Sequence, residues 1–347
     1  MLKTVARSKF CRLSVLPSRS VHETNRKLEV KEVQEIKIPV PWGHIAGKWW
    51  GSSDKKPLLG LHGWQDNAGT WDRLAPLLPS DISLLAIDSP GHGLSSYFPR
   101  GVPYRITDQI FTLRHVVNYY GWDKISLLAH SMGAVQSFIY SAVYPDQVEN
   151  LILVDAFKPL SVDPKKDIDK LAAGLDRFLK VEDVNDSLKP SYSYEETVQR
   201  LYDGMVGQSL SKESCEVLLK RGTEKFGDKY AFTRDKALKV GRLSGWLHGY
   251  VLYMASCITC NVLFIKADPG LVFESLEVNK QTLETMKKSA KVFEFHTVEG
   301  LHHVHLNNPE RVAPIIINFL KSPNQKKSDI SISSLEKMSK KEFLNFM

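Results

Sequence analysis

The chain has 347 residues, of which 43% are hydrophobic, so it is long and apolar enough to bury a substantial core. The formal net charge is +7, but residues 1–22 hold five basic and no acidic residues, and residues 321–347 hold six lysines against three acids. The body between these ends is therefore close to neutral, which argues against a nucleic-acid-binding protein. No stretch approaches 18 consecutive apolar residues, so we expect no transmembrane helix.

The first segment, residues 1–34, is expected to be a basic leader or a disordered segment. Its acid-free, arginine- and serine-containing start suits an organelle transit peptide, and a disordered basic tail is the alternative. The four cysteines are too few and too scattered for a disulfide framework. We therefore expect an intracellular, reducing compartment, which is mitochondrial if the leader is a transit peptide.

The body begins with an expected β-hairpin at residues 35–50 and then alternates short apolar runs with helical stretches. The apolar runs are residues 58–61, 82–87, 125–129 and 151–154, and the helical stretches are residues 70–78, 107–120 and 132–144. Apolar strands without polar alternation, separated by helices, are typical of a parallel sheet covered on both faces. The expected fold class is α/β, with a mostly parallel, doubly wound sheet.

The strand–helix alternation stops after the first part of the core, residues 35–157. Residues 158–260 are charged, helix-prone and rich in aromatic side chains, which predicts a helical insertion. A second part of the core, residues 261–320, resumes with strands at 261–266 and 291–298 and a closing helix at 309–320. Residues 321–347 form a polar tail.

Residues 129–133 (AHSMG) lie between an expected strand and an expected helix. They match the G-x-S-x-G nucleophile elbow, in which small residues flank a serine on a sharp strand-to-helix turn; alanine replaces the first glycine. Ser131 is therefore the candidate nucleophile, and an ordinary N-cap serine is the alternative interpretation. The backbone N–H of Met132, which follows the nucleophile, is a candidate oxyanion-hole donor.

Three further segments extend this pattern: residues 61–64 (LHGW), 88–95 (DSPGHGLS) and 300–309 (GLHHVHLNNP). In these motifs the chain resembles the α/β-hydrolase superfamily. The resemblance implies that His302, seven residues before Pro309, is the catalytic base and that the Trp64 N–H is the second oxyanion donor. A metal held by the histidines of residues 300–309 is the alternative, but no acidic residue lies in this loop, and no metal or other cofactor is expected.

The acid that orients the histidine is expected to follow the strand after the insertion. Asp268 fits that place, although its loop is shorter than the common form in the superfamily. Asp155, at the end of the strand at 151–154, is the alternative, because some lipase relatives carry the acid there.

Residues 61–71, 129–133 and 302–305 are similar to those of the serine hydrolase-like proteins, the kraken type. This resemblance implies a hydrolase, with peroxisomal or vesicular placement for some members. We expect a Ser-His-Asp acyl-enzyme mechanism on a small ester or thioester, with an acyl substrate and water as the only partners. A binding or signalling protein with little turnover and a triad-based lyase are the alternatives, and the sequence predicts no oligomeric state.

The insertion is expected to form a lid over the nucleophile. Trp246, Tyr250 and Met254 are its candidate substrate-binding residues, because apolar and aromatic lid side chains set the size of an acyl pocket.

Overall fold

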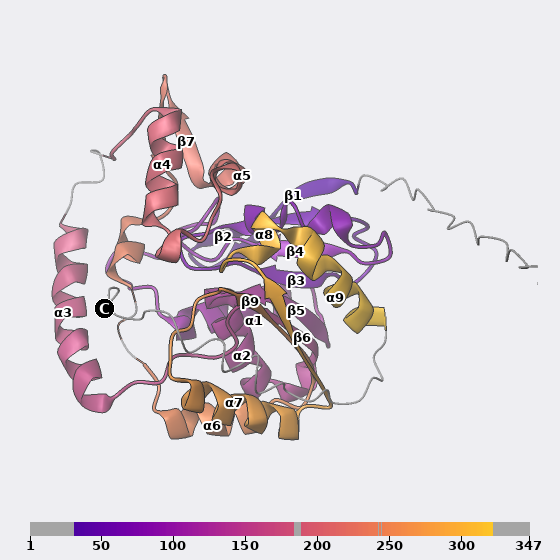
Figure 1. Ribbon diagram of the computed structural model, residues 1–347. Helices are drawn as coiled ribbons and strands as arrows, with labels where there is room; N and C mark the ends of the chain where they lie inside the picture. Colours follow the sequence, from indigo (N-terminus) through magenta and orange to yellow (C-terminus); the bar gives the residue numbers. More distant parts are fainter. Residues whose placement is uncertain (1–30, 184–188, 242, 244, 322–347) are drawn as a thin grey trace, which may run out of the picture.

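The computed structural model describes residues 31–183, 189–241, 243 and 245–321 (Figure 1). The expected leader, apart from residues 31–34, and the tail after residue 321 lie outside the described residues. Among the described residues, no helix combines the length and apolar character needed to cross a bilayer.

One eight-stranded sheet forms the centre of the molecule, in the order β1-β2-β4-β3-β5-β6-β9-β10. Its strands are β1 (Val33–Val40), β2 (Gly43–Trp50), β3 (Leu58–Leu61), β4 (Leu84–Ile87), β5 (Ile125–His130), β6 (Val148–Val154), β9 (Asn261–Asp268) and β10 (Val292–Glu299). β1 and β2 are antiparallel to their neighbours, and all other pairs are parallel. The expected doubly wound, mostly parallel sheet is confirmed.

Helices cover both faces of this sheet, as Figure 1 shows. One face packs against α1 (Ile106–Tyr119), α2 (Met132–Val143), α6 (His248–Ser256) and α7 (Leu276–Ser289). The other face packs against α9 (Pro309–Lys321) and two short 3-10 helices, η1 (Ala68–Trp71) and η2 (Ala75–Leu77). Because both faces are covered, β3, β4 and the last four residues of β6 are fully buried, which explains their uninterrupted apolar sequences.

The segment between β6 and β9 departs from the sheet and forms its own small cluster. It contains α3 (Pro164–Glu182), α4 (Tyr194–Gly204), α5 (Lys212–Gly222), the hairpin β7 (Thr223–Phe226) and β8 (Lys229–Phe232), and η6 (Lys236–Val240). Apolar side chains of α4 and α5 pack with Leu306 of α8 (Val304–Asn307). The segment is thereby anchored on the loop that follows β10.

Three details differ from the sequence-based expectations. The helix expected at residues 70–78 is two 3-10 turns with Pro76 at the start of the second. The hairpin β7–β8 interrupts the insertion expected to be helical. The third difference is α6, which packs on α2 and α7 in the main core, so the departure from the sheet ends before this helix.

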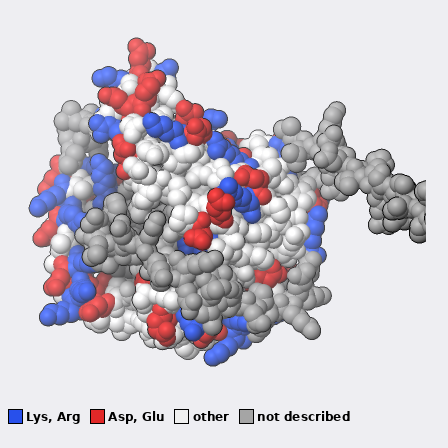
Figure 2. All heavy atoms as spheres, viewed as in Figure 1, with Lys and Arg blue, Asp and Glu red and all other residues white. Residues whose placement is uncertain are grey.

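Charged side chains are intermixed on the part of the surface that Figure 2 shows uncovered. Lysine and arginine lie beside aspartate and glutamate along the protruding α4 and β7 region and over α3. This face therefore has no large area of one sign of charge.

Candidate functional site

Ser131 stands between β5 and α2 with a left-handed backbone, φ 52° and ψ −114°. This conformation is unusual for a residue other than glycine and directs the side chain away from the sheet. The elbow requires Gly133, because a Cβ there would lie 2.4 Å from the carbonyl oxygen of Leu61 in β3. A Cβ at Gly63 would be a tight fit, 3.0 Å from His130 Nδ1 and 3.3 Å from the Cβ of Ser131.

His302 joins Ser131 to a buried carboxylate. Its Nε2 lies 2.9 Å from Ser131 Oγ, and its Nδ1 lies 2.6 Å from Asp155 Oδ2. In the neutral tautomer that satisfies both contacts, Nδ1–H donates to Asp155 and Nε2 accepts from the serine hydroxyl. The geometry therefore places a base beside a hydroxyl and an acid behind the base, as nucleophilic catalysis requires.

The expectation that Asp268 contacts the histidine is wrong. Asp268 is the last residue of β9, pairs in register with Glu299 of β10, and accepts the Gly300 N–H at its main-chain oxygen. The place beside His302 Nδ1 is taken by Asp155, the alternative, which follows β6 with φ 54°. The end of β9 and the loop after it surround Asp155 instead, because the N–H groups of Ala267 and Leu271 donate to its carboxylate.

Lys266 also contacts this carboxylate, although no sequence motif pointed to it. Its Nζ donates to Asp155 Oδ1 and, at 3.0 Å, to the carbonyl oxygen of Leu271. Both charged side chains are buried, with 2% of Lys266 and none of Asp155 exposed. A lone lysine in an otherwise apolar strand sequence was the signal for a buried anionic partner.

Trp64 and Met132 lie where the elbow and the loop after β3 meet. Among the described residues, neither main-chain N–H has a hydrogen-bond acceptor. Met132 begins α2, where the first N–H groups of a helix have no partner within it. Both donors therefore remain available to an anionic oxygen beside Ser131.

A cluster of buried imidazoles lies behind the nucleophile. The ring of His130 packs at a tilt against those of His302, His303 and His305, with centroids 4.5, 4.6 and 4.2 Å away. Burial lowers the pKa of His130 and of His303 well below the usual value and that of His305 to about 3, so all three are neutral at pH 7. The uncharged rings of His130 and His303 pack directly against His302.

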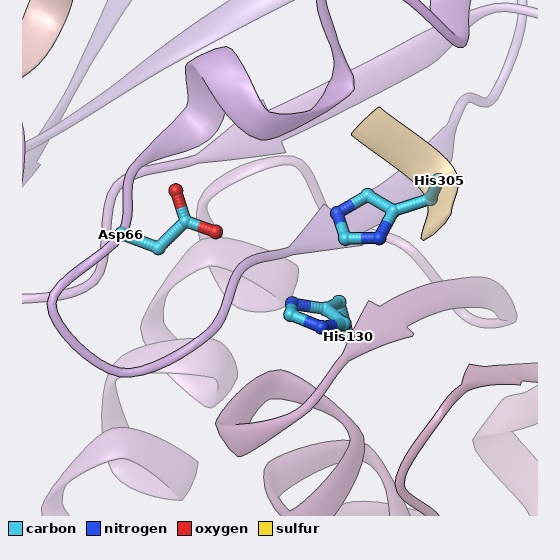
Figure 3. Close-up of side chains that lie close together, drawn as sticks. All are labelled: Asp66, His130 and His305. Atoms are coloured by element: carbon cyan, nitrogen blue, oxygen red, sulfur yellow. The ribbon is translucent and has the colours of Figure 1, made fainter. Parts of the chain in front are cut away.

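Asp66 faces two of these rings across a shared space, as Figure 3 shows. Among the described residues, Asp66 Oδ2, His130 Nδ1 and His305 Nδ1 have no hydrogen-bond partner, and the three residues offer atoms within 4.8 Å of one another that could hold a metal ion. Burial raises the pKa of Asp66 to about 7. The expected absence of a metal stays a prediction.

The three candidate substrate-binding residues lie around α6, on the face of the sheet that carries α2 and α7. Met254 is buried in the main core, where Trp246 also packs. Tyr250 stacks on Trp246 with centroids 5.3 Å apart and is half exposed. Among the described residues, no hydrogen bond or ring contact joins any of the three to Ser131 or His302, and Met254 is a core residue.

Known proteins share this sequence and fold. Residues 56–309 match the family model of the alpha/beta hydrolase fold. A probable serine hydrolase of Drosophila melanogaster is 40% identical over 321 residues, which cover 92% of this chain and 97% of that protein. Serine hydrolase-like protein 2 of Homo sapiens is 37% identical, covering 83% of this chain and 94% of that protein.

Two solved structures extend the similarity. The hypothetical protein PA1622 from Pseudomonas aeruginosa PAO1 has a TM-score of 0.73 and 30% identity, covering 83% of this chain and 99% of that one. The thioesterase domain from the curacin biosynthetic pathway has a TM-score of 0.70 and 22% identity, covering 83% and 99%, and supports the fold alone. The sequence and structure together support a hydrolase function. The chain belongs to the α/β-hydrolase family and, within it, resembles the serine hydrolase-like proteins, as its motifs predict.

Proposed function

We propose that the protein is a serine hydrolase that cleaves a small ester or thioester through an acyl-enzyme formed on Ser131. The observation that carries this proposal is the continuous hydrogen-bonded arrangement of Ser131, His302 and Asp155. The three residues follow β5, β6 and β10, and their hydrogen bonds support a Ser-His-Asp triad.

In the proposed reaction, Ser131 Oγ attacks the acyl carbonyl carbon while His302 Nε2 takes the hydroxyl proton. Asp155 holds the imidazole and stabilises the imidazolium that forms. The N–H groups of Trp64 and Met132 donate to the developing oxyanion, each donor contributing roughly 3 kcal/mol to transition-state stabilisation. His302 then protonates the leaving alcohol or thiol, and water repeats the cycle on the acyl-enzyme.

The segment between β6 and α6 is proposed to act as a lid. Ser209 Oγ lies 2.8 Å from His303 Nδ1, and Asn307 Nδ2 donates to the Ser209 carbonyl oxygen at 2.8 Å. Asn67, three residues after Trp64, donates from Nδ2 to the Leu218 carbonyl oxygen at 3.0 Å. These contacts tie the segment to the loops that carry His302 and Trp64, which supports a covering role.

A panel of esters and acyl thioesters of increasing chain length tests the function. Wild type should release acid with an initial burst of alcohol or thiol, because the acyl-enzyme accumulates when its hydrolysis is slower than its formation. Ser131→Ala should lose the burst and the turnover. Full activity in Ser131→Ala would reject Ser131 as the nucleophile, and product formation without acid release would favour the triad-based lyase.

The compartment remains a prediction within this proposal. A fluorescent fusion at the carboxyl end of the full chain, with and without residues 1–30, tests the expected intracellular placement. A mitochondrial signal that is lost on truncation supports a transit peptide.

A further inference from the structure

The Asp155 carboxylate lies against a buried ammonium as well as against His302. Lys266 Nζ and the Ala267 N–H donate to Oδ1, while the Leu271 N–H and His302 Nδ1–H donate to Oδ2. Gly270 is packed so closely that a Cβ there would lie 2.3 Å from Asp155 Oδ1 and 2.4 Å from Lys266 Nζ. The loop therefore encloses the pair and fixes both charged groups.

Burying a lysine is unfavourable unless an anion compensates it, and this lysine has Asp155 as its carboxylate partner. A carboxylate alone behind His302 would strongly favour the imidazolium. An ammonium on the same carboxylate reduces that effect, because charges a few ångströms apart interact strongly away from bulk water.

We propose that Lys266 is a positioning residue of this site: its ammonium fixes the Asp155 carboxylate against His302 and offsets the negative charge of that carboxylate. The inference rests on the proposed function, since it assigns a role to Lys266 in the same triad.

Two imidazoles and one phenyl ring pack against His302. The rings of His130 and His303 pack against it from β5 and from its own loop, and Phe273 packs from the loop after β9. Both imidazoles are neutral because burial lowers their pKa values. Among the described residues, Asp155 is the one carboxylate that hydrogen-bonds His302, and Lys266 contacts that carboxylate; Asp66 lies 3.9 Å from His303 Nε2.

The rate at which a fluorophosphonate labels Ser131, measured against pH, tests the role without a physiological substrate. Removing the ammonium in Lys266→Met should shift the acidic limb of this rate profile to a pH about one unit higher, because His302 then binds a proton more tightly. Lys266→Gln, which also removes the charge, should move it in the same direction, and Lys266→Arg should restore the wild-type limb.

Lys158→Met is the matched control. Lys158 is likewise buried and bound to a carboxylate, that of Glu274, but no hydrogen bond joins it to Asp155 or His302 among the described residues. Lys158→Met should be less stable than wild type but should leave the acidic limb of the labelling rate against pH unchanged. An unchanged limb in folded Lys266→Met or Lys266→Gln overturns the proposal, as does failure of both to fold, which makes the lysine purely structural. Failure of wild type to label rejects the proposed function itself.

A cavity of about 880 Å³ lies elsewhere, between the loop after β4, α3, α4 and η6. Six basic and three acidic side chains line it, and neither Ser131 nor His302 does. Of these residues, Arg234 is the one whose contacts point to a ligand. Among the described residues it forms no hydrogen bond or ion pair, and its guanidinium lies over the ring of Phe232, 4.3 Å from the centroid.

Partial burial lowers the pKa of Arg234 to about 10, because desolvation disfavours the charged form. The neighbouring carboxylate does not pair with it, because Asp235 accepts from Tyr104 Oη at 2.6 Å and from the Ala237 N–H. We infer that this cavity binds an anionic oxygen group, a carboxylate or a phosphate, on Arg234, since a guanidinium pairs with either through two parallel hydrogen bonds.

Thermal unfolding with added phosphate or succinate, at constant ionic strength, tests this site independently of catalysis. One or both anions should raise the Tm of wild type, and which of them does so identifies the group. Arg234→Gln should bind at least roughly tenfold more weakly and, without ligand, should be at least as stable, because it removes a partly buried cation that has no ion-pair partner among the described residues.

Arg177→Gln on the exposed face of α3 is the matched control and should respond as wild type does. Arg200→Gln, on the cavity side of α4, should weaken the response and serves if Arg234→Gln does not fold. No effect of either anion on wild type, or an equal effect on all variants, overturns the inference.

Discussion

Asp155 is held by more donors than a carboxylate needs for orientation alone. Two main-chain N–H groups, one ammonium and one imidazole share its two oxygens, and all of them come from the end of β9 and from the segments after β9 and β10. The end of β9 and the loop after it therefore supply hydrogen-bond donors to the carboxylate, while the carboxylate itself comes from the residue after β6.

Replacing the acid tests this assignment. Asp155→Asn should lower kcat/KM for an activated ester by roughly 10³- to 10⁴-fold, because the amide favours the wrong imidazole tautomer. Asp268→Asn is the matched control and should stay within about threefold of wild type. A large loss in Asp268→Asn with little change in Asp155→Asn would restore Asp268 as the acid.

Asp66 allows a prediction on stability. Its pKa is raised to about 7, so the unfolded chain releases this proton near pH 4 while the folded protein retains it until about pH 7. The folded state therefore loses stability as pH rises between these values. Asp66→Asn should remove that loss and gain on the order of a few kcal/mol at pH 8 but little at pH 4.

Chemical denaturation of wild type and Asp66→Asn at both pH values measures the difference. The added amide hydrogens also supply donors that the unpartnered nitrogens of His130 and His305 lack. A gain that is equal at pH 4 and pH 8 would show that the carboxylate does not titrate in this range.

Sequence motifs predicted Ser131 and His302 because each lies in a short segment whose spacing is local. The acid could not be chosen in this way, since Asp155 and Asp268 both follow apolar strand residues and the choice depends on how the loop after β9 folds. The role of Lys266 depends on the same fold. The buried cluster around Asp66 joins residues more than 200 positions apart, so no local pattern indicates it.

At the scale of elements, the strands were predicted well because burial on both faces removes polar residues from them. Residues 58–61 match β3, and the other strands differ from expectation mainly at their ends. The sequence did not predict the hairpin β7–β8, because its strands are largely exposed and charged and so lack a buried apolar run. Periodicity also could not assign α6 to the main core, since that depends on its contacts with α2 and α7.

The contact between α2 and β3 yields a prediction on the elbow. Gly133→Ala should destabilise the protein by several kcal/mol or displace Ser131, because its Cβ would press on the main chain of Leu61. Gly249→Ala in α6 is the control, since a Cβ at this position would meet no other atom within 4 Å. It should be neutral or stabilising by up to about 1 kcal/mol.

Urea denaturation and Ser131 labelling of both variants measure these effects. Gly133→Ala with wild-type stability and labelling would contradict the close approach of α2 to β3.

At the scale of the whole molecule, buried neutral histidines should make the protein sensitive to acid. Burial lowers the pKa of His62 to about 4 and that of His305 to about 3, and it lowers those of His92, His130 and His303 well below the usual value. Below about pH 6.5 the unfolded chain binds protons at these positions and the folded protein does not, so stability falls as pH falls.

Each such histidine lowers the free energy of unfolding by roughly 1.4 kcal/mol for each pH unit of acidification. Asp66, whose pKa is raised, has the opposite effect between about pH 7 and pH 4 and cancels the contribution of one histidine. We expect the free energy of unfolding to decrease steeply between pH 6 and pH 4, and His305→Gln to reduce that slope. Denaturant titrations across this range provide the measurement. A stability that stays flat from pH 7 to pH 4 would contradict the buried, neutral state of these rings.

The proposed chemistry depends most on Ser131 being an activated nucleophile. Mass spectrometry after treatment with a fluorophosphonate tests this directly, because the reagent forms a covalent bond with a serine only where a base has activated it. We predict one label per chain, located on Ser131, and labelling strongly slowed in folded His302→Gln. An unlabelled Ser131 in folded wild type, or a label on another serine, would contradict the proposed mechanism.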